Sequence, residues 1–172
     1  RQLKSYARKG GEAVEPVDLR AAVSSALTMM EPQLRTRSIR VVQNRPRGKV
    51  MVRADRIRLE QVIINLLRNA VDAVKDKRDA RIEISVESGA HAYVSVRDNG
   101  PGVSDLEKLF EPFWTTKKPG EGTGLGLAIS SSIVADFGGR LTAHNENEGG
   151  AVFLVELPLH DPDQPTQALA AE

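Results

Sequence analysis

Four short groups of residues along the chain have the types and the spacing that nucleotide chemistry needs. They are Asn65 with Asn69, Asp98 at the start of Asp-Asn-Gly-Pro-Gly, the segment 110–117, and the glycines of 122–126. Amide oxygens can hold a metal ion, a carboxylate can read the edge of a base, and successive N–H groups can bind phosphate oxygens. Each group alone is a weak signal, but the four together in this order predict a nucleotide pocket.

The two asparagines fall on a helix that we expect to begin after Asp55 and to run to about Lys75. A step of 100° per residue places Asn65 and Asn69 on one polar face, opposite a face that is apolar. A solvated helix face is the alternative, but Asn is a poor helix former and Lys or Glu would serve solvent better. Mg²⁺ takes oxygen ligands and keeps several waters, so we predict Asn69 as a metal ligand with Asn65 supporting it.

Asp98 follows an apolar strand and precedes two glycines. Its carboxylate could accept a hydrogen bond from the exocyclic amine of adenine, a contact that guanine could not make because it has a carbonyl there. Gly100 and Gly102 would let the backbone approach the ring closely. The alternative is a simple turn, for which Asp-Asn-Gly-Pro-Gly is a strong sequence by itself.

Gly122, Gly124 and Gly126 alternate immediately before an expected helix. The pattern lacks the Gly-Lys-Ser/Thr ending of the Walker motif and does not match the dinucleotide G-x-G-x-x-G, so both of those folds are disfavoured. N–H groups at a helix N-terminus nonetheless bind anions, and glycine lets a phosphate come close. A flexible hinge is the other interpretation, and both can hold at once.

Three aromatic residues, Phe110, Phe113 and Trp114, stand beside Thr115, Thr116 and Lys117 in a segment expected to be a loop. A lid over a phosphate needs apolar side chains that anchor it to the domain, and hydroxyl and ammonium groups that contact the phosphate. A role in the core alone remains open for the aromatic residues.

The elements that must position these groups follow from periodicity and from turn residues. We expect helices from about Pro16 to Met30, from 55 to 75 and from 124 to 137, with a short helix at 104–107. We expect strands at 39–42 and 50–52, joined as a hairpin, and at 81–87, 93–96, 140–144 and 151–157. The segment 111–122 is expected to be a mobile loop, and the tail from Leu159 to be disordered.

Composition allows one domain and disfavours several classes of partner. The chain has 172 residues, of which 40% are hydrophobic and 27% charged, with a formal net charge of +1. That balance gives no reason to expect nucleic acid or direct membrane contact. The absence of Cys excludes disulfides and thiolate metal sites, and no long apolar run or signal peptide is visible. Because the chain begins at Arg1, we interpret it as part of a longer protein.

With these residues in place, the chain resembles the catalytic ATP-binding domain of sensor histidine kinases, in the superfamily shared with gyrase, the chaperone Hsp90 and MutL. The resemblance covers roughly Pro16 to Pro158. The sequence Phe-Glu-Pro-Phe-Trp-Thr-Thr-Lys at 110–117 is similar to the corresponding motif of the nitrogen-regulatory and dicarboxylate-transport sensors in particular. The resemblance implies an α/β sandwich (α+β), in which a mixed five-stranded sheet packs against three helices, with ATP and Mg²⁺ between them under a mobile lid.

The resemblance also implies roles for individual residues. Asn65 and Asn69 would be the asparagines of the metal box, Asp98 the adenine-binding aspartate, and Lys117 with Asn65 and Asn69 the groups that assist transfer. The nucleotide would further contact Asp72, Gly100, Gly102, Thr115, Thr116, Gly122, Thr123, Gly124, Leu125 and Gly126. Two departures stand out, because Asp72 occupies a position that is basic in some family members and the third glycine box is reduced to Gly149-Gly150. Lys117 and Arg68 are the candidate replacements for the basic charge.

Asn65 bears on the reaction. The related ATPases resemble one another in having a Glu one turn before the metal asparagine, where it can activate water as a general base. An amide cannot take a proton from water at neutral pH, so Asn65 favours phosphoryl transfer to an external acceptor.

The acceptor histidine is not evident in the chain. His91, His144 and His160 lie at a strand start, at a strand end and in the tail, and we expect ordinary structural or surface roles for them. We therefore divide the chain into the end of a dimerisation hairpin with its linker (1–15), the ATP-binding catalytic domain (16–158) and a disordered tail (159–172). The acceptor would belong to the protein's own dimerisation domain, and a response regulator would act downstream. The chain alone should be monomeric, and the whole protein a homodimer in the cytoplasmic portion of an inner-membrane sensor.

Two other function classes stay open at this stage. The chain could be a superfamily ATPase or a protein-serine kinase, which ATP turnover or phosphoserine on a partner would reveal. It could also be a nucleotide-binding interaction module that binds ATP without transferring it.

Overall fold

The computed structural model describes residues 14–163. Its elements follow one another as β1 (Glu15–Asp18), α1 (Leu19–Thr36), β2 (Arg40–Asn44), β3 (Met51–Ala54), α2 (Arg56–Ala73), β4 (Arg81–Ser88), β5 (Ala92–Asp98), α3 (Gly126–Asp136), β6 (Arg140–Asn145) and β7 (Ala151–Leu157). Within this range no helix combines the length and the apolar character that crossing a bilayer requires.

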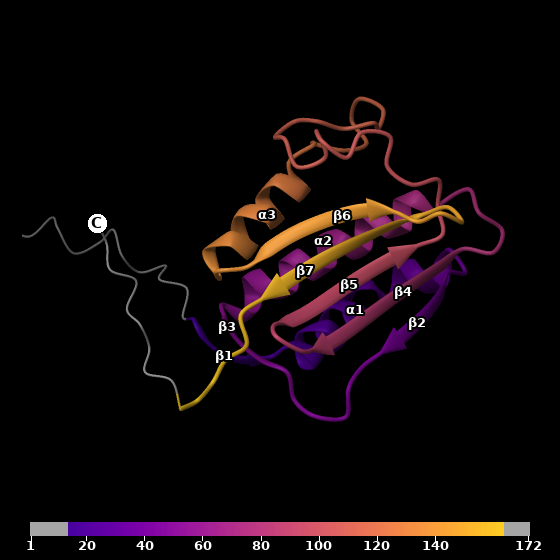
Figure 1. The fold of residues 1–172 in the computed structure, drawn as a ribbon. Coiled ribbons are helices and arrows are strands. Elements are labelled where there is room, and N and C mark those ends of the chain that lie inside the picture. The colour runs from indigo at the N-terminus through magenta and orange to yellow at the C-terminus, as the bar shows by residue number, and fades with distance from the viewer. Residues whose placement is uncertain (1–13, 164–172) are drawn as a thin grey trace, which may run out of the picture.

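Five of the strands form one mixed sheet in the order β2-β4-β5-β7-β6. β2 runs parallel to β4, and every other neighbouring pair is antiparallel. The three helices cover one face of this sheet, so the molecule has two layers (Figure 1). The expected α/β sandwich, with a mixed five-stranded sheet against three helices, is confirmed.

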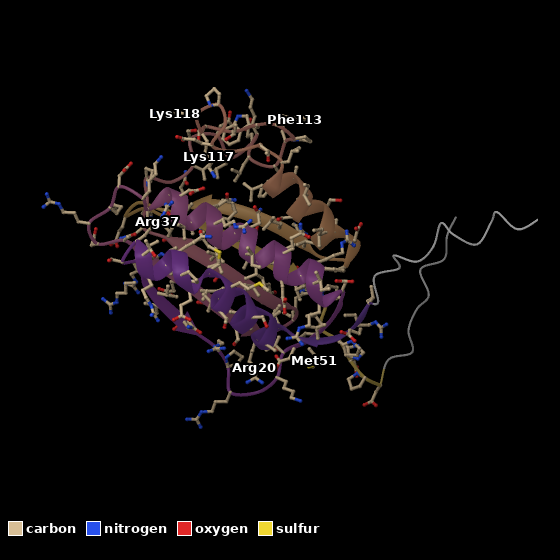
Figure 2. The ribbon with its side chains drawn as sticks, turned by 180° about the vertical axis from the view of Figure 1, so that it is seen from behind. Arg20, Arg37, Met51, Phe113, Lys117 and Lys118 are labelled. Atoms are coloured by element: carbon tan, nitrogen blue, oxygen red, sulfur yellow. The ribbon has the colours of Figure 1, made fainter. Side chains whose placement is uncertain are left out.

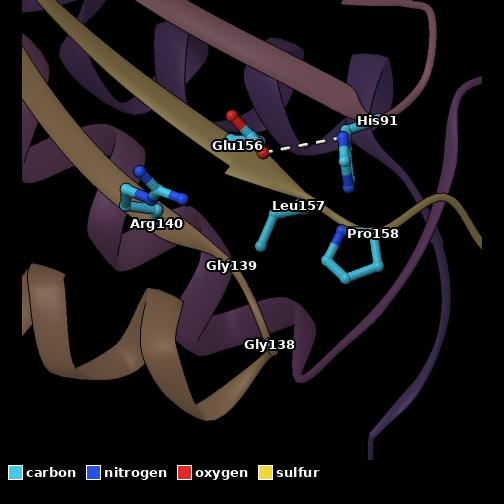
Figure 3. A pocket seen from close by; sticks show the side chains of 7 residues that line it. All are labelled: His91, Gly138, Gly139, Arg140, Glu156, Leu157 and Pro158. Atoms are coloured by element: carbon cyan, nitrogen blue, oxygen red, sulfur yellow. Dashed lines mark ion pairs between the residues drawn. The ribbon is translucent and has the colours of Figure 1, made fainter.

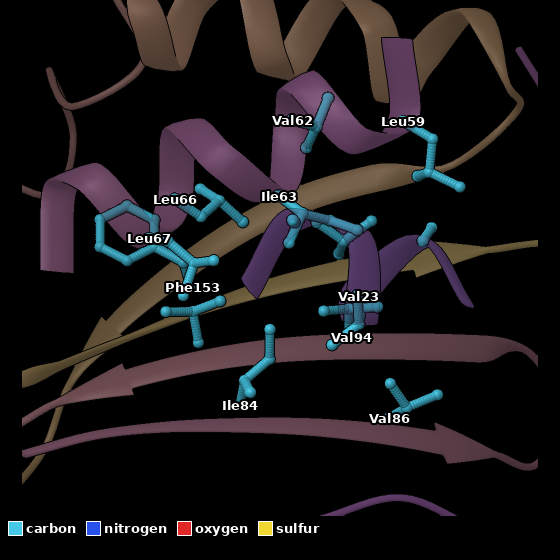
Figure 4. Close-up of a cluster of buried hydrophobic side chains, with 14 of the residues drawn as sticks. Val23, Leu59, Val62, Ile63, Leu66, Leu67, Ile84, Val86, Val94 and Phe153 are labelled. Carbon is cyan, nitrogen blue, oxygen red and sulfur yellow. The ribbon is translucent and has the colours of Figure 1, made fainter. Parts of the chain in front are cut away.

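The core lies between α2 and the sheet. Leu59, Ile63 and Leu66 on α2 are at most 1% exposed, and the expected apolar face of the helix is thus fully buried. These side chains belong to one buried cluster with Ile84 of β4, Val94 of β5 and Val23 of α1 (Figure 4). Asp55 caps the helix as expected, because its Oδ1 accepts a hydrogen bond from the N–H of Arg58 at 2.9 Å. Burying one face of α2 leaves its polar face to border the candidate site.

The expected hairpin of residues 39–42 with 50–52 is wrong. β2 pairs in parallel with β4, whereas β3 pairs antiparallel with β1 in a separate two-stranded sheet, where Val17 faces Val52. The residues from Glu15 to Asp18 are therefore a strand, and the first helix begins only at Leu19. Alternation of apolar residues reveals a strand but not its partner, and the loop between β2 and β3 carries the chain to a different sheet.

The short helix expected at 104–107 is also wrong. The segment forms turns, in which Oδ1 of Asp105, rather than the Ser104 hydroxyl, accepts from the N–H of Lys108 at 3.2 Å. A single helical turn fixes several dihedral angles for one hydrogen bond, so a capping pattern alone does not nucleate it. The whole connection 101–125 has no helix or strand.

Both ends of the described chain meet β3. The N–H of His160 donates to the carbonyl of Met51 at 2.8 Å, on a strand that β1 already borders. The first residues of the expected tail are thus tied to the domain at this point. Residues 1–13 of the expected hairpin end and linker, and residues 164–172 of the expected tail, lie outside the described residues.

Candidate nucleotide-binding site

Asp98 is the last residue of β5, and its side chain lies inside the protein with only 3% of the residue exposed. Its Oδ1 accepts a hydrogen bond from the N–H of Gly100 at 2.8 Å. Burial raises the pKa of this carboxyl above the usual 3.8, and hydrogen bonds from the backbone of Gly100 and Ala151 oppose that rise. A buried carboxylate with few partners is suited to a polar ligand that donates hydrogen bonds.

Glycines pack the backbone closely around Asp98. A Cβ on Gly100 would lie 2.6 Å from the carbonyl oxygen of Ala73, so the turn after β5 touches the C-terminal end of α2. A Cβ on Gly150, which has φ of +98°, would lie 1.9 Å from the carbonyl oxygen of Asp98. The reduced glycine box at Gly149-Gly150 therefore forms a wall of this side of the site.

The sequence analysis missed Asn145, the last residue of β6. Its Oδ1 accepts from the N–H of Val103 at 2.7 Å, and its Nδ2 donates to the carbonyl of Val103 at 2.8 Å. Gly102, with φ of +83°, makes room for this clamp, because a Cβ there would lie 2.9 Å from Oδ1 of Asn145. The sequence does have an Asn at the end of a strand before a Gly-Gly turn, which could have indicated this role. The same pattern is equally typical of an ordinary turn residue.

Asn65 joins α2 to α3. Its Nδ2 donates to the hydroxyl of Ser130 at 3.0 Å, and a Cβ on Gly126 would lie 2.4 Å from its Oδ1. Ser130, which is 2% exposed, was not expected to take part. Gly126 thus allows the first turn of α3 to lie directly against the amide of Asn65.

Asn69 lies one turn further along α2, between Asn65 and the contact of Ala73 with Gly100. Its side chain is half-buried, and within residues 14–163 it has no hydrogen-bond partner. An amide in this position keeps its oxygen for a ligand.

The segments 110–117 and 122–126 lie back to back. The N–H of Phe113 donates to the carbonyl of Gly124 at 2.9 Å, and both residues have positive φ, +66° and +68°. Phe110 and Trp114 pack against the core as the expected anchors. Phe113 is instead 74% exposed and points away from the domain (Figure 2).

Lys117 reaches from the loop to α2, where its ammonium forms an ion pair with the carboxylate of Asp72. A Cβ on Gly122 would lie 2.8 Å from the Lys117 side chain, so this glycine also borders the lysine. The hydroxyl of Thr115 accepts a hydrogen bond from the N–H of Lys117 at 3.1 Å, and the hydroxyl of Thr123 accepts one from the N–H of Leu125 at 3.3 Å. Thr116 is exposed. Asp72, which departs from the family pattern, and Lys117, a candidate replacement for the basic charge, therefore neutralise each other.

The N-terminus of α3 has no side-chain cap. Leu125 is its N-cap residue and makes no side-chain cap hydrogen bond. Free N–H groups and the positive end of the helix dipole favour an anion at such a position. The glycine loop 122–126 leads directly into this helix end, as the sequence predicted.

The structure also has a pocket away from these residues, beside His91. A pocket of about 290 Å³ at the far end of β5 and β7 is lined by His91, Arg140 and Glu156, among others (Figure 3). His91 Nδ1 lies 3.5 Å from Glu156 Oε1, and His144 Nε2 lies 3.3 Å from Glu146 Oε1. The residues predicted for the nucleotide do not line this pocket.

Residues 54–161 match the family model described as histidine kinase-, DNA gyrase B- and HSP90-like ATPase. The chain belongs to this family. The range contains Asn65, Asn69, Asp98 and the glycine loop, and the family assignment made from those residues is confirmed.

Curated relatives place the chain among sensor kinases. It is 42% identical to the two-component sensor PprA of Pseudomonas aeruginosa over 93% of its length, and 39% identical to the C4-dicarboxylate transport sensor DctB of the same organism over 90%. The second match agrees with the predicted resemblance to dicarboxylate-transport sensors. The chain spans only 18% and 26% of these two relatives.

Solved structures give the same result for the fold. The catalytic domain of histidine kinase ThkA superposes with a TM-score of 0.75 at 33% identity, over 85% of this chain and 95% of that one. ThkA in complex with the response regulator TrrA matches with a TM-score of 0.73 at 30% identity, over 86% and 42%. The chain is thus an ATP-binding domain of the histidine kinase type.

Proposed function

We propose that this domain binds Mg-ATP and passes the γ-phosphoryl group to a histidine on a dimerisation domain of the same protein. One arrangement carries the proposal: the polar face of α2 has the buried carboxylate of Asp98 at one border and the uncapped N-terminus of α3 at the other. Asn65 and Asn69 lie between them. An adenine amine and a phosphate chain need groups of these two kinds, separated in this manner.

The residues present fit a nucleotide. Asp98 would accept the hydrogen bond from the adenine amine, which compensates the cost of keeping that carboxylate buried. The space that a Cβ on Gly100 would fill allows the backbone to lie near the base. Gly102 and Asn145 would hold the following turn in place.

Asn69 is the residue that would hold Mg²⁺, with Asn65 supporting it. A half-buried amide oxygen and phosphate oxygens form a ligand set that Mg²⁺ accepts, with waters completing its octahedron. The metal would neutralise charge that develops on the phosphoryl oxygens.

The glycine loop 122–126 and the residues Thr115, Thr116 and Lys117 would contact the phosphates. Lys117 would exchange the carboxylate of Asp72 for a phosphate oxygen, since both are anions within reach of the same ammonium. Asp72 would then be left beside the bound nucleotide, where it could accept hydrogen bonds from it.

Asn65 supports transfer rather than hydrolysis. Its amide donates to Ser130, and a neutral amide cannot activate water as a carboxylate can. The acceptor histidine would attack the γ-phosphorus, the bond to the β-phosphate oxygen would break, and ADP would leave. The catalytic contribution of Asn65, Asn69 and Lys117 is positioning and charge neutralisation.

The whole protein would be a homodimer at the cytoplasmic side of the inner membrane, and a response regulator would take the phosphoryl group from the histidine. Support comes from the relatives, which are named as two-component and transport sensors, and from the ThkA complex with a response regulator. The 172-residue chain alone would be monomeric.

The decisive experiment supplies the missing acceptor. The chain is incubated with Mg-ATP alone, and then with the purified dimerisation hairpin of its parent protein. We expect neither self-phosphorylation nor fast hydrolysis in the first case. In the second we expect slow formation of an acid-labile, alkali-stable phosphohistidine on the hairpin, because the lost tether lowers the effective concentration of the acceptor. Rapid phosphate release by the chain alone would favour an ATPase. Phosphoserine on a partner would favour a serine kinase, and ATP binding without transfer would favour an interaction module.

A further inference from the structure

The net charge of +1 conceals a strong asymmetry. Between Glu31 and Asp55 the sequence has no acidic residue, but it has seven basic ones: Arg35, Arg37, Arg40, Arg45, Arg47, Lys49 and Arg53. All seven are exposed. They lie at the end of α1, on β2, on the loop to β3 and, for Arg53, on β3 itself. The loop projects from the domain on the side opposite the segment 110–126 (Figure 1).

A groove of about 380 Å³ runs through this basic region, between α1 and β2. Its apolar lining comprises Leu27, Leu34, Ile39 and Val41, of which the last two are only partly buried. Arg35 and Arg45 stand on its rims, and Arg45 reaches over to the hydroxyl of Ser24 on α1 at 2.5 Å. Glu31 is the acidic member of the lining, and it is held in an exposed ion pair with Arg35.

β2 adds free backbone groups beside the groove. The N–H of Arg40 donates to Ala80 on the β4 side, so strand alternation turns the N–H and C=O groups of Val41 and Gln43 to the opposite side. In residues 14–163 no strand pairs with that side of β2. An unpaired strand edge beside an apolar groove is a template for an added strand.

We propose that this groove binds an extended polypeptide segment of a partner, with apolar residues alternating with Glu or Asp. Its backbone pairs with Val41 and Gln43, its apolar side chains enter the groove, and its carboxylates meet Arg35 and Arg45. A concave floor with a strand edge fits an extended chain better than a flat lipid surface. The site shares no residue with the nucleotide site, so its failure would leave the proposed kinase function intact.

The test uses a labelled synthetic peptide in which Glu alternates with Val or Leu, titrated into the 172-residue protein and followed by fluorescence anisotropy. We expect saturable binding that weakens as salt rises, and about a tenfold loss for the double variant Arg35→Glu with Arg45→Glu. The variant Arg140→Glu reverses one charge at the other edge of the sheet and should bind as the original protein does. Absence of binding, or equal loss in Arg140→Glu, overturns the proposal.

Two further comparisons separate strand pairing from plain charge attraction. Gln43→Pro removes an outward N–H from an exposed edge position, which an edge strand tolerates, and should weaken peptide binding while ATP binding stays unchanged. A peptide of the same composition with its Glu residues grouped at one end should bind worse than the alternating one. Should Gln43→Pro bind normally, or should vesicles containing anionic lipid bind while the peptide does not, the groove is not a strand site. If the double Glu variant fails to fold, Arg35→Gln with Arg45→Gln takes its place.

Discussion

The two halves of the candidate nucleotide site differ in how firmly the fold holds them. The base half, formed by Asp98, Gly100, Gly102, Gly150 and Asn145, is packed so closely that added methyl groups would meet backbone or amide atoms within 3 Å. In the phosphate half only Gly124 and Gly126 are packed as closely, against Phe113 and Asn65. Thr115, Thr116 and Gly122 are exposed, and Lys117 is held to α2 by its ion pair with Asp72. The fold thus shapes the proposed base pocket in advance and leaves the proposed cover over the phosphates less firmly held.

The largest expected effect tests the packing of the base half. Gly150→Ala should lower the free energy of unfolding by about 3–5 kcal/mol, because the methyl group would overlap the carbonyl of Asp98 and no rotation relieves it. The matched control is Gly120→Ala in the loop, which also has positive φ but has no atom within 4 Å. Backbone strain alone should cost about 1–2 kcal/mol there. Urea denaturation of both variants decides this, and equal losses would remove the distinction between the halves.

Asp98→Ala should weaken binding of both ATP and ADP by about 2–4 kcal/mol while the domain stays folded, because a desolvated charge-assisted hydrogen bond is removed. Isothermal titration calorimetry gives the affinities, and circular dichroism checks the fold. The base-reading role of Asp98 would be contradicted if the original protein bound GTP as tightly as ATP. It would also be contradicted if the Asp98→Ala variant bound ATP as tightly as the original protein.

The buried carboxyl of Asp98 also predicts a pH dependence. Burial raises its pKa above 3.8, so the folded protein keeps this proton at pH values where the unfolded chain has lost it. The contribution of this group to stability therefore falls as the pH rises from 3.8 through the raised value. Asp98→Asn should lose that part of the dependence, which urea denaturation across this pH range would detect. Parallel stability curves for the two proteins would show that Asp98 titrates normally.

Asn69→Ala should abolish the strengthening of ATP binding by Mg²⁺ and leave Mg²⁺-free ADP binding intact, because only the metal bridge is lost. Gln61→Ala provides the control, since Gln61 is an exposed residue on the polar face of the same helix. Calorimetry with and without Mg²⁺ separates the two effects. A metal effect that survives in Asn69→Ala would place the ion elsewhere.

The smallest effect concerns the phosphate half. Residues 111–122 should exchange amide hydrogens quickly without nucleotide and become more protected with a non-hydrolysable ATP analogue than with ADP. The residues around Asp98 should be protected in all three states. Asp72→Asn would free Lys117 and speed exchange in the loop before nucleotide is added. Identical protection with both nucleotides would make the loop a passive cover.

The sequence predicted the parts of the fold that depend on local pattern. The apolar period of α2, its Asp55 cap and the strands β4 and β5 follow from neighbours a few residues apart. The parallel pairing of β2 with β4 could not be predicted in this way, because a strand of alternating residues fits many partners. The two-stranded sheet of β1 and β3 was missed because residues 16–18 were expected to begin the first helix.

The candidate site divides in the same manner. Asn65, Asn69, Asp98 and the glycines have residue types that are unusual for their positions, and so they could be named in advance. Ser130 and Asn145 act through contacts across the fold, where a Ser in a helix and an Asn at a strand end look ordinary. The ion pair of Lys117 with Asp72 joins residues 45 positions apart. The sequence could suggest Lys117 only as a replacement for the basic charge that some family members have at position 72.

The small sheet of β1 and β3 has a mechanical consequence. Residues 15–18 border β3, and residue 160 is hydrogen-bonded to Met51 at the start of the same strand. A pull or twist applied to the chain on either side of the domain is therefore delivered first to β3. From there α2 runs about 20 Å before it reaches Asn69. A force on the chain before residue 15 or after residue 160 would thus act on the domain near β3, at the opposite end of α2 from Asn69.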